Sequence, residues 1–542
     1  MKFIDRTIII CLGIYFLFFT FYNLNWGAPF YFHPDERNIA SSISQLNYTS
    51  NLNPNFFAYG QLPIYTIYIT SLFANFISRF SLNPVISFEQ AIITGRLISA
   101  LISIALVYLI YKSTVELKNK AAGIFSLIFA TTSVTFLQFN HFTTFEMWLC
   151  YFFLLTTFLL FKFIKTKKYL YFVLASACFG ILCGLKLSSV AYGLIFIYAG
   201  IVKTIEIKKN THKIIELTKL TAIFTILSAF FYMVTSPYNL FDINQFTGSM
   251  NYESGVALGT MKVFYTGTFE DQIPLIFQLQ KILPFLINPI LTTTAIPTII
   301  YTFYIFIIKK NHQLGLFLFS FIILFASTSF LYVKWTRYIV PAVPFLYILI
   351  SIFLTDLVNN KFVAKKIPNI RLILIILFVA SGILFSFSFL KTVRLEPDTR
   401  ISALYFAQKK IPYSSTILSE VYDLGIVPFN SNYKSITLFN FYDLDNGNSQ
   451  KKLLPPLLAS NEYMILPSPR IYESRISHKN SFPNGNEFYS KLFSKNSNFK
   501  KIYETPCGFF CKITYMGDPV FNTELTANVF DRPTVFIFKK DR

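Results

Sequence analysis

The sequence predicts an α-helical, multi-pass membrane protein that ends in a small α/β domain. Of its 542 residues, 54% are hydrophobic and only 14% are charged, and the mean hydropathy is +0.50. Apolar runs of about 20 residues, the length that crosses a ~30 Å hydrocarbon core, recur along the chain. From about residue 391 these runs shorten, and Asn, Pro, Ser and Asp become frequent. We therefore expect a membrane domain over residues 1–390 and an extracytoplasmic domain over residues 391–542.

The apolar runs predict about eleven transmembrane helices. They lie near residues 7–26, 92–111, 121–139, 146–164, 169–185, 188–204, 217–235, 283–308, 314–333, 338–357 and 371–390. A further run, 62–80, is interrupted by Pro63, Asn75 and Arg79. We expect this run to lie along the membrane interface or to re-enter on the same side.

The basic charge of the chain indicates membrane topology, although a net charge of +21 (48 basic minus 27 acidic residues) also fits a nucleic-acid-binding protein. The lysines, however, cluster in short blocks between apolar runs, as residues that set topology do. These blocks include residues 112–120, 162–168, 203–213, 309–310 and 361–366. The positive-inside rule places them and the N-terminus in the cytoplasm, and places the loop 27–91 and the C-terminal domain outside. We therefore expect a cytoplasmic (inner) membrane protein with no nucleic-acid partner.

The candidate catalytic acids lie in the first outer loop, in the segment Phe32-His33-Pro34-Asp35-Glu36-Arg37. Adjacent carboxylates repel each other unless a cation, a metal or a proton transfer compensates. Pro34 disfavours helix at His33, so a helix would begin near Pro34 with both acids in its first turn. An acidic helix cap on a surface loop is the alternative interpretation.

A third acid and two cations join these candidates. Glu146 opens the span after the second outer turn. A favourable interaction with the helix dipole is a sufficient structural reason for a carboxylate at this position. The functional interpretation is that Glu146 is a second carboxylate in the cavity of Asp35. Arg96 and Lys186 lie within or at the edge of apolar runs, where an ionised group is costly and marks a functional site by default. Snorkelling to the interface is the structural alternative.

The C-terminal region predicts local elements of an α/β domain. Asp398 can cap a helix that runs to Lys410, and strand-like runs occur at residues 416–418, 463–466 and 535–538. Cys507 and Cys511 can form a disulfide in an oxidising compartment, whereas a zinc site lacks a matching second pair.

A cavity that combines carboxylates, isolated cations and aromatic walls suits transfer of a sugar from a lipid phosphate. A carboxylate can take the proton of an attacking hydroxyl, and Lys or Arg can stabilise the leaving phosphate. A transporter or flippase of a lipid-linked or anionic solute would also use intramembrane cations. Transporters usually show repeated, broken helices, and the sequence has no such repeat.

Short motifs along nearly the whole chain resemble the GT-C polyprenyl-phosphate-dependent glycosyltransferases, the superfamily of the protein O-mannosyltransferases and the lipid A aminoarabinose transferase. Within it, the chain resembles the bacterial phospholipid-carrier-dependent members. The motifs are Phe32-His33-Pro34-Asp35-Glu36, Tyr59-Gly60-Gln61-Leu62-Pro63, Gly95-Arg96-Leu97, His141-Phe142-Thr143-Thr144-Phe145-Glu146, Gly184-Leu185-Lys186, Arg337-Tyr338-Ile339-Val340-Pro341 and Arg470-Ile471-Tyr472.

The resemblance implies a GT-C fold and inverting transfer of a sugar from a polyprenyl-phosphate donor to an unidentified acceptor at the outer face. It implies Asp35 as the catalytic base, with Glu36 and Glu146 orienting or polarising the acceptor. The phosphate-binding cations would be Arg96, Lys186 and Arg337, with His33, Tyr59 and His141 as substrate or loop contacts. Some relatives carry a divalent metal, which Asp35, Glu36 and His141 would hold here.

Overall fold

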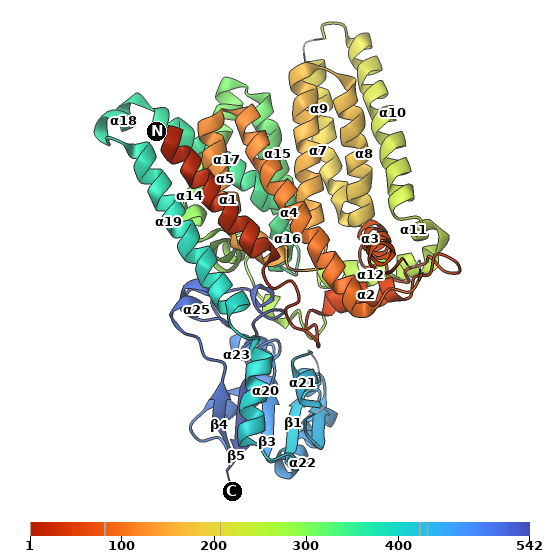
Figure 1. The fold of residues 1–542 in the computed structure, drawn as a ribbon, viewed down its shortest axis with the longest axis vertical. Coiled ribbons are helices and arrows are strands. Elements are labelled where there is room, and N and C mark those ends of the chain that lie inside the picture. The colour runs from red at the N-terminus through yellow and green to blue at the C-terminus, as the bar shows by residue number, and fades with distance from the viewer. Residues whose placement is uncertain (1, 81–82, 206, 422–423, 431, 542) are drawn as a thin grey trace.

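The chain forms a helical bundle joined at one end to a small α/β domain (Figure 1). The computed structural model describes residues 2–80, 83–205, 207–421, 424–430 and 432–541. The N-terminus lies near the end of the bundle that is remote from this domain, and the C-terminus lies at the far tip of the domain. The helices of the bundle and its loops are α1 (Lys2–Phe21), α2 (Pro34–Ser44), α3 (Gln61–Arg79), α4 (Phe88–Leu117), α5 (Lys120–Thr131), α6 (Val134–Phe139), α7 (Glu146–Thr166), α8 (Tyr169–Leu185), α9 (Leu194–Thr204), α10 (Asn210–Thr235), α11 (Tyr238–Phe241), α12 (Ile243–Leu258), α13 (Leu283–Ile287), α14 (Pro289–Lys309), α15 (His312–Ser329), α16 (Thr336–Ile339), α17 (Val343–Asn359), α18 (Lys361–Lys366) and α19 (Ile370–Leu390).

Short 3₁₀ and π segments extend or join these helices. The 3₁₀ segments are η1 (Leu187–Gly193), η2 (Gly267–Phe269), η4 (Val340–Ala342), η6 (Leu424–Ile426), η7 (Phe441–Asp445) and η8 (Leu525–Ala527), and the π segments are η3 (Gln278–Ile282) and η5 (Lys391–Leu395). Because η1 and η4 continue directly into α9 and α17, each pair acts as one longer rod.

Within the described residues, eight helical stretches are long and apolar enough to cross a membrane. Three shorter apolar helices, Arg6–Phe21, Lys120–Thr131 and Tyr169–Leu185, coincide with the remaining predicted spans. A helical multi-pass protein is thereby confirmed, but these criteria do not confirm the predicted count of eleven.

Two predicted spans are not continuous helices. The run 121–139 divides into α5 and α6 because Ser133 leaves the helix and caps α6, accepting a hydrogen bond from Phe136 N. The run 283–308 divides at Asn288, whose φ of +75° ends α13 just before Pro289 begins α14. Proline lacks the N–H that a continuous helix needs at that position, and it fits the first turn of a new one.

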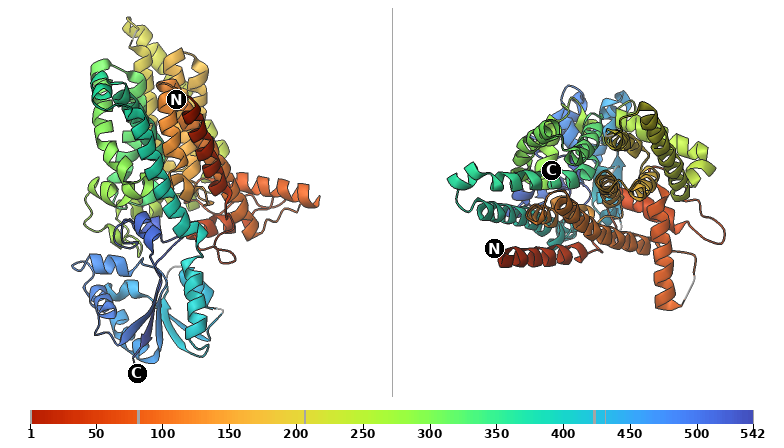
Figure 2. Two further views of the ribbon diagram at one scale, coloured as in Figure 1. Left: turned by 60° about the vertical axis from the view of Figure 1, so that its left-hand side comes forward. Right: turned by 90° about the horizontal axis from the view of Figure 1, so that it is seen from above.

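The interrupted run 62–80 forms α3, which runs crosswise to the bundle (Figure 2). Its exposed apolar side chains recur at helical spacing and include Ile69, Phe73 and Ile77. A helix with this orientation and one exposed apolar face is typical of a segment that lies along a membrane surface. Of the two expected alternatives, the structure favours a helix along the membrane interface over a re-entrant segment.

The C-terminal region contains a five-stranded sheet in the order β2-β1-β3-β5-β4. Its elements are α20 (Thr399–Lys410), β1 (Thr416–Glu420), α21 (Val427–Asn430), β2 (Ser435–Phe439), α22 (Asn448–Ser460), β3 (Tyr463–Leu466), α23 (Tyr472–Ser477), α24 (Pro483–Phe493), β4 (Phe499–Glu504), α25 (Phe509–Thr514) and β5 (Phe536–Lys540). β1 pairs in parallel with β2 and β3, whereas β5 runs antiparallel to β3 and β4. The predicted cap is confirmed, since Asp398 accepts a hydrogen bond from Arg400 N.

Residues 505–534, which we call the docking segment, leave the sheet between β4 and β5 and pack into the core of the bundle. Cys511, Tyr515 and Phe530 belong to the same buried apolar cluster as the transmembrane helices. Cys507 and Cys511 form a disulfide in this segment, as predicted. The docking segment therefore brings C-terminal residues to the end of the bundle that faces the C-terminal domain.

Candidate active site

The acidic segment begins α2 as predicted, with Pro34 in its first position and Asp35 and Glu36 in its first turn. His33 is the N-cap residue and has an extended backbone. Because neighbouring residues on a helix point about 100° apart, the two carboxylates face different surroundings. Asp35 faces a cavity, and Glu36 is buried in the protein.

Asp35 is held by two side chains from distant parts of the chain. Arg337, in the short helix α16 that precedes η4 and α17, forms an ion pair with Asp35 Oδ2, and both side chains are partly exposed. Tyr59 donates a hydrogen bond of 3.3 Å to the same oxygen. Burial alone would raise the pKa of Asp35, but Arg337, and then His33 and Arg470, hold it below its usual value. The carboxyl is therefore ionised at neutral pH.

The cavity in front of Asp35 has a volume of about 510 Å³ and lies between the bundle and the C-terminal domain. Both parts supply its walls. Its charged lining residues are Asp35, Glu253, Arg337, Arg470 and Glu524, and its aromatic lining residues are Phe56, Tyr59, Tyr252, Phe264, Tyr265, Trp335 and Phe530. A polar centre surrounded by aromatic rings suits a sugar, which has both hydroxyl groups and apolar C–H faces.

Glu36 and Arg96 form a separate, fully buried ion pair. Arg96 donates to both carboxylate oxygens of Glu36, at 2.9 and 2.7 Å, and neither side chain is exposed. Arg96 also donates to the backbone carbonyls of Leu24 and Trp26, each at 2.8 Å, and Thr143 N donates to Glu36 at 2.7 Å. These contacts fix the loop that carries Glu36 to α4 and occupy the charged groups of both side chains within the protein. The phosphate-binding role of Arg96 and the acceptor-orienting role of Glu36 stay predictions.

Lys186 and Glu146 lie near Asp35 but are not among the lining residues of the cavity. Lys186 Nζ is 4.1 Å from the centre of the Tyr338 ring, and the charges of Arg337, Glu146 and Asp35 act on it. Glu146 is buried at the start of α7, and its Oε2 has no hydrogen-bond partner among the described residues. The structure thus gathers both predicted residues around Arg337.

A close backbone contact places Lys186 beside the loop that carries Tyr59. Gly60 N donates to Leu185 O at 2.9 Å, and a Cβ atom on Gly60 would overlap the carbonyl of Gly184. Only glycine fits at this contact. The two motifs noted in the sequence therefore meet in space.

Sequence comparison supports the resemblance for part of the chain. A family model described as dolichyl-phosphate-mannose-protein mannosyltransferase matches residues 71–232. A comparison with curated proteins finds no match.

The fold is shared with a solved oligosaccharyltransferase. The apo crystal structure of the Archaeoglobus fulgidus oligosaccharyltransferase superposes with a TM-score of 0.56 at 11% identity, covering 100% of this chain and 89% of that one. The chain has the GT-C glycosyltransferase fold. The same archaeal enzyme, AglB, in complex with an inhibitory peptide and a dolichol-phosphate gives a TM-score of 0.50 at 12% identity, covering 99% and 88%. ArnT from Cupriavidus metallidurans gives 0.45 at 12% identity, covering 87% and 94%.

The two histidines of the GT-C motifs pack in the structure and do not converge on a metal site. His33 stacks on Phe530 with ring centres 4.1 Å apart, and burial lowers its pKa to about 4. One ring nitrogen of His141 forms a hydrogen bond with Leu137 O, and the other forms one with Tyr22 O. Within the described ranges, no group of three or more His, Cys, Asp or Glu side chains could hold a metal ion. The set Asp35, Glu36 and His141 therefore does not fit a metal.

Three cavity residues received no role from the sequence. Glu253 lies on α12, and burial raises its pKa. Glu524, in the docking segment, accepts hydrogen bonds from Thr336 N at 2.8 Å and from Thr526 N at 3.1 Å. Arg470 follows β3, and only its place in a short motif marked it. Local patterns give no signal for Glu253 or Glu524, because their roles arise from contacts with distant segments.

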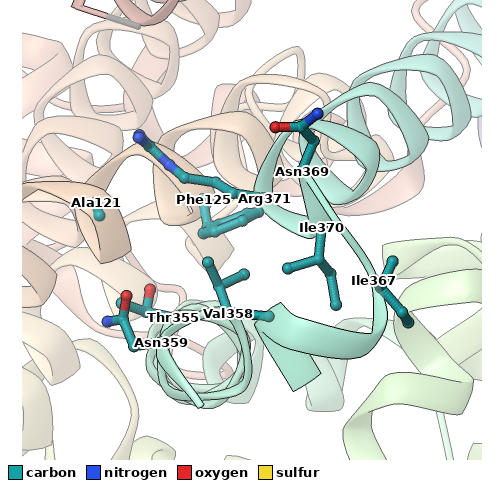
Figure 3. A pocket seen from close by; sticks show the side chains of 10 residues that line it. Ala121, Phe125, Thr355, Val358, Asn359, Ile367, Asn369, Ile370 and Arg371 are labelled. Atoms are coloured by element: carbon teal, nitrogen blue, oxygen red, sulfur yellow. The ribbon is translucent and has the colours of Figure 1, made fainter. Parts of the chain in front are cut away.

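A second cavity, of about 340 Å³, lies at the opposite end of the bundle, between α5, α17 and the segment from α18 to α19 (Figure 3). Arg371 is its single charged lining residue, and no carboxylate lines it. It therefore lacks the acid–cation pairing that characterises the cavity around Asp35.

Proposed function

We propose that this protein transfers a sugar from a polyprenyl-phosphate-linked donor to an acceptor, such as a protein hydroxyl, a glycolipid or a cell-surface glycan, with inversion at the anomeric carbon. The observation that carries this proposal is the Asp35–Arg337 pair at the wall of a cavity between the bundle and the C-terminal domain. The fold of solved glycosyltransferases and the mannosyltransferase family match support the same activity.

In this proposal, Asp35 is the base and the nearby cations bind the leaving phosphate. The acceptor oxygen attacks the anomeric carbon and gives its proton to Asp35, while the bond from that carbon to the phosphate oxygen breaks. The electron pair leaves with the phosphate, whose growing charge Arg337 and Lys186 stabilise. Tyr59, which donates to Asp35, keeps the carboxylate directed at the cavity.

An apolar groove of about 320 Å³ between α13, α14 and α15 supports a lipid-linked donor. Its lining residues are Leu279, Leu283, Ala295, Ile296, Ile299, Ile300, Phe321, Ile322, Phe325, Ala326 and Leu346. Next to it, the Lys281 carbonyl accepts a hydrogen bond from Glu524 N, and Glu524 lines the cavity. A polyprenyl chain in this groove would have its phosphate near the cavity.

We also propose that the cavity faces the outside of a cytoplasmic (inner) membrane, with the N-terminus in the cytoplasm. The basic blocks on the side opposite to the C-terminal domain support this orientation. The Cys507–Cys511 disulfide in the docking segment supports it as well, because disulfides persist in oxidising compartments.

The test is transfer from a labelled polyprenyl-phosphate sugar by the purified protein, with a cell-envelope extract as the source of acceptor. Asp35→Asn should lower the rate by about 10²–10⁴-fold, the usual contribution of a positioned general base. Asp271→Asn, which neutralises an exposed acid outside the cavity, is the matched control and should keep the wild-type rate. Full activity of Asp35→Asn would reject Asp35 as the base. Movement of the donor across the bilayer without any transfer by the wild type would favour a transporter.

A further inference from the structure

The cavity at the end of the bundle remote from the C-terminal domain has no role in the proposed glycosyl transfer (Figure 3). It has a volume of about 340 Å³, and most of its lining residues are apolar, among them Phe125, Val358 and Ile370. Asn359 and Asn369 also line it, and their side-chain amides can donate hydrogen bonds. The cavity therefore combines apolar walls with polar groups that suit an amphipathic ligand.

The short helix α18 places positive charge beside this cavity. It contributes Ala364 to the lining and carries Lys361, Lys365 and Lys366, all of which are exposed. Lys361 precedes Ala364 by three residues, so the two lie on the same face of the helix. Lys365 is four residues after Lys361 and therefore lies next to it. A ligand in the cavity thus has two cations within reach of its exposed end.

Two other charges near the cavity already have partners within the chain. Arg371 lines the cavity, but it has an interaction within the protein, so we assign it no part in binding a ligand. Asp356, on α17, forms an ion pair with Lys118 at 2.5 Å. Among the described residues, no carboxylate lines the cavity, and none pairs with Lys361 or Lys365. The lysines of α18 are therefore cations that a ligand can neutralise.

The surface of α19 next to the cavity suits acyl chains. Directly after the lining residue Arg371, the exposed side chains of α19 are apolar and include Leu372, Ile373, Ile376 and Leu377. Because α19 is long and apolar enough to cross a membrane, this surface lies against the hydrocarbon of the bilayer. A molecule with an anionic headgroup and acyl chains would use both the lysines and this surface, whereas a free phosphate would use the lysines alone.

We infer that this cavity binds an anionic phospholipid, with its phosphate against Lys361 and Lys365 and its acyl chains along α19. Lysines close to a membrane surface attract anionic lipids, which supplies the preference for a negatively charged headgroup. Asn359 and Asn369 donate hydrogen bonds to the oxygens between the phosphate and the chains. The inference does not depend on the proposed glycosyl transfer, which takes place at the other end of the bundle.

The experiment measures lipid binding to the full chain in detergent micelles by native mass spectrometry. Dioleoyl phosphatidylglycerol is the anionic probe, dioleoyl phosphatidylcholine is the probe without net charge, and glycerol 1-phosphate is the soluble competitor. Lys361→Gln/Lys365→Gln removes the two cations, and Ala364→Trp adds a large side chain to the cavity wall without changing its charge. Lys208→Gln/Lys209→Gln is the matched control, because it removes two exposed cations just before α10, on the other side of the bundle from α18 (Figure 1, Figure 2).

We expect the wild type to bind its first phosphatidylglycerol about tenfold more tightly than phosphatidylcholine, and Lys361→Gln/Lys365→Gln to lose that preference. Ala364→Trp should weaken phosphatidylglycerol binding by about tenfold as well, while the control variant keeps the wild-type affinity. Equal affinity of the wild type for the two lipids, or an equal loss in the control variant, would overturn the inference. Full binding by either of the other two variants would also reject the site. Displacement of the lipid by an equal concentration of glycerol 1-phosphate would show a free-phosphate site and contradict a lipid ligand.

Discussion

The buried pair of Glu36 and Arg96 allows a direct test of a structural role against a catalytic one. Removing one partner of a fully buried ion pair leaves the other charge uncompensated, which costs about 3–5 kcal/mol. Both side chains are completely buried, so solvent does not screen this interaction. We therefore expect Arg96→Met and Glu36→Gln each to lower the free energy of unfolding by roughly that amount.

The double variant Glu36→Met/Arg96→Met should recover part of this loss, because it removes both charges. It still leaves three backbone groups without their partners, namely Thr143 N and the carbonyls of Leu24 and Trp26. A buried unpaired polar group costs about 1–3 kcal/mol, which limits the recovery. The sum of the two single effects should nevertheless exceed the effect of the double variant by about 2 kcal/mol or more, within the range of coupling energies for contacting residues.

The assay is denaturant unfolding in mixed micelles, followed by tryptophan fluorescence. Trp26 is a local reporter, since the Arg96 guanidinium lies 4.4 Å from the centre of its ring. The exposed pair Lys500–Asp541 is the matched control, and its cycle should give a coupling below about 1 kcal/mol. If Arg96→Met unfolds like the wild type but no longer binds polyprenyl phosphate, Arg96 is a phosphate-binding residue and the structural assignment is wrong.

Two further predictions concern the stability and positioning of the site. The pKa of His33 is about 4 in the folded protein, below its ordinary value of 6.5. Between these two pH values the unfolded chain therefore binds more protons than the folded one. The free energy of unfolding should fall as the pH drops from 6.5 to 4, by up to about 3 kcal/mol. His33→Phe keeps the ring stacking and should reduce the difference in unfolding midpoint between pH 7 and pH 4.5; an unchanged difference would contradict the assignment. Glu524→Gln should weaken the hydrogen bond to Thr336 N that begins the helix of Arg337, and so raise the KM for the donor by up to about tenfold with little change in kcat. A fall in kcat at constant KM would instead place Glu524 in the chemical step.

Local signals in the sequence predicted those parts of the fold that depend on neighbouring residues. The start of α2 at Pro34, the cap of α20 at Asp398 and the strand β3 follow from side chains within a few positions. The strands β2 and β4 were not predicted. β2 is mostly half-exposed at one sheet edge, and Lys500 and Lys501 interrupt the apolar pattern of β4 at the other.

The site was predicted less completely, because its residues are paired across long sequence separations. A charge in an apolar run predicts function only if its partner is a ligand, and Arg96 instead finds Glu36, 60 positions away. The Asp35–Arg337 pair spans 302 positions, and the contact of Glu524 with Thr336 spans 188. No local pattern encodes such pairings, so the sequence yields candidate residues and the fold decides which of them meet.

The two acid–arginine pairs at the start of α2 differ in burial, and burial determines which of them a substrate can reach. The Glu36–Arg96 pair is fully buried and has every partner it needs, so a substrate cannot compete for it without leaving a buried charge. The Asp35–Arg337 pair is 21% and 16% exposed and lines the cavity, so a substrate group can reach it. We propose that a donor phosphate entering the cavity draws Arg337 away from Asp35, because the new charged hydrogen bonds offset the loss of the old ones. In the proposed mechanism, that exchange would bind the leaving group and free the carboxylate for the acceptor's proton in a single step, which a pair as buried as Glu36–Arg96 does not allow.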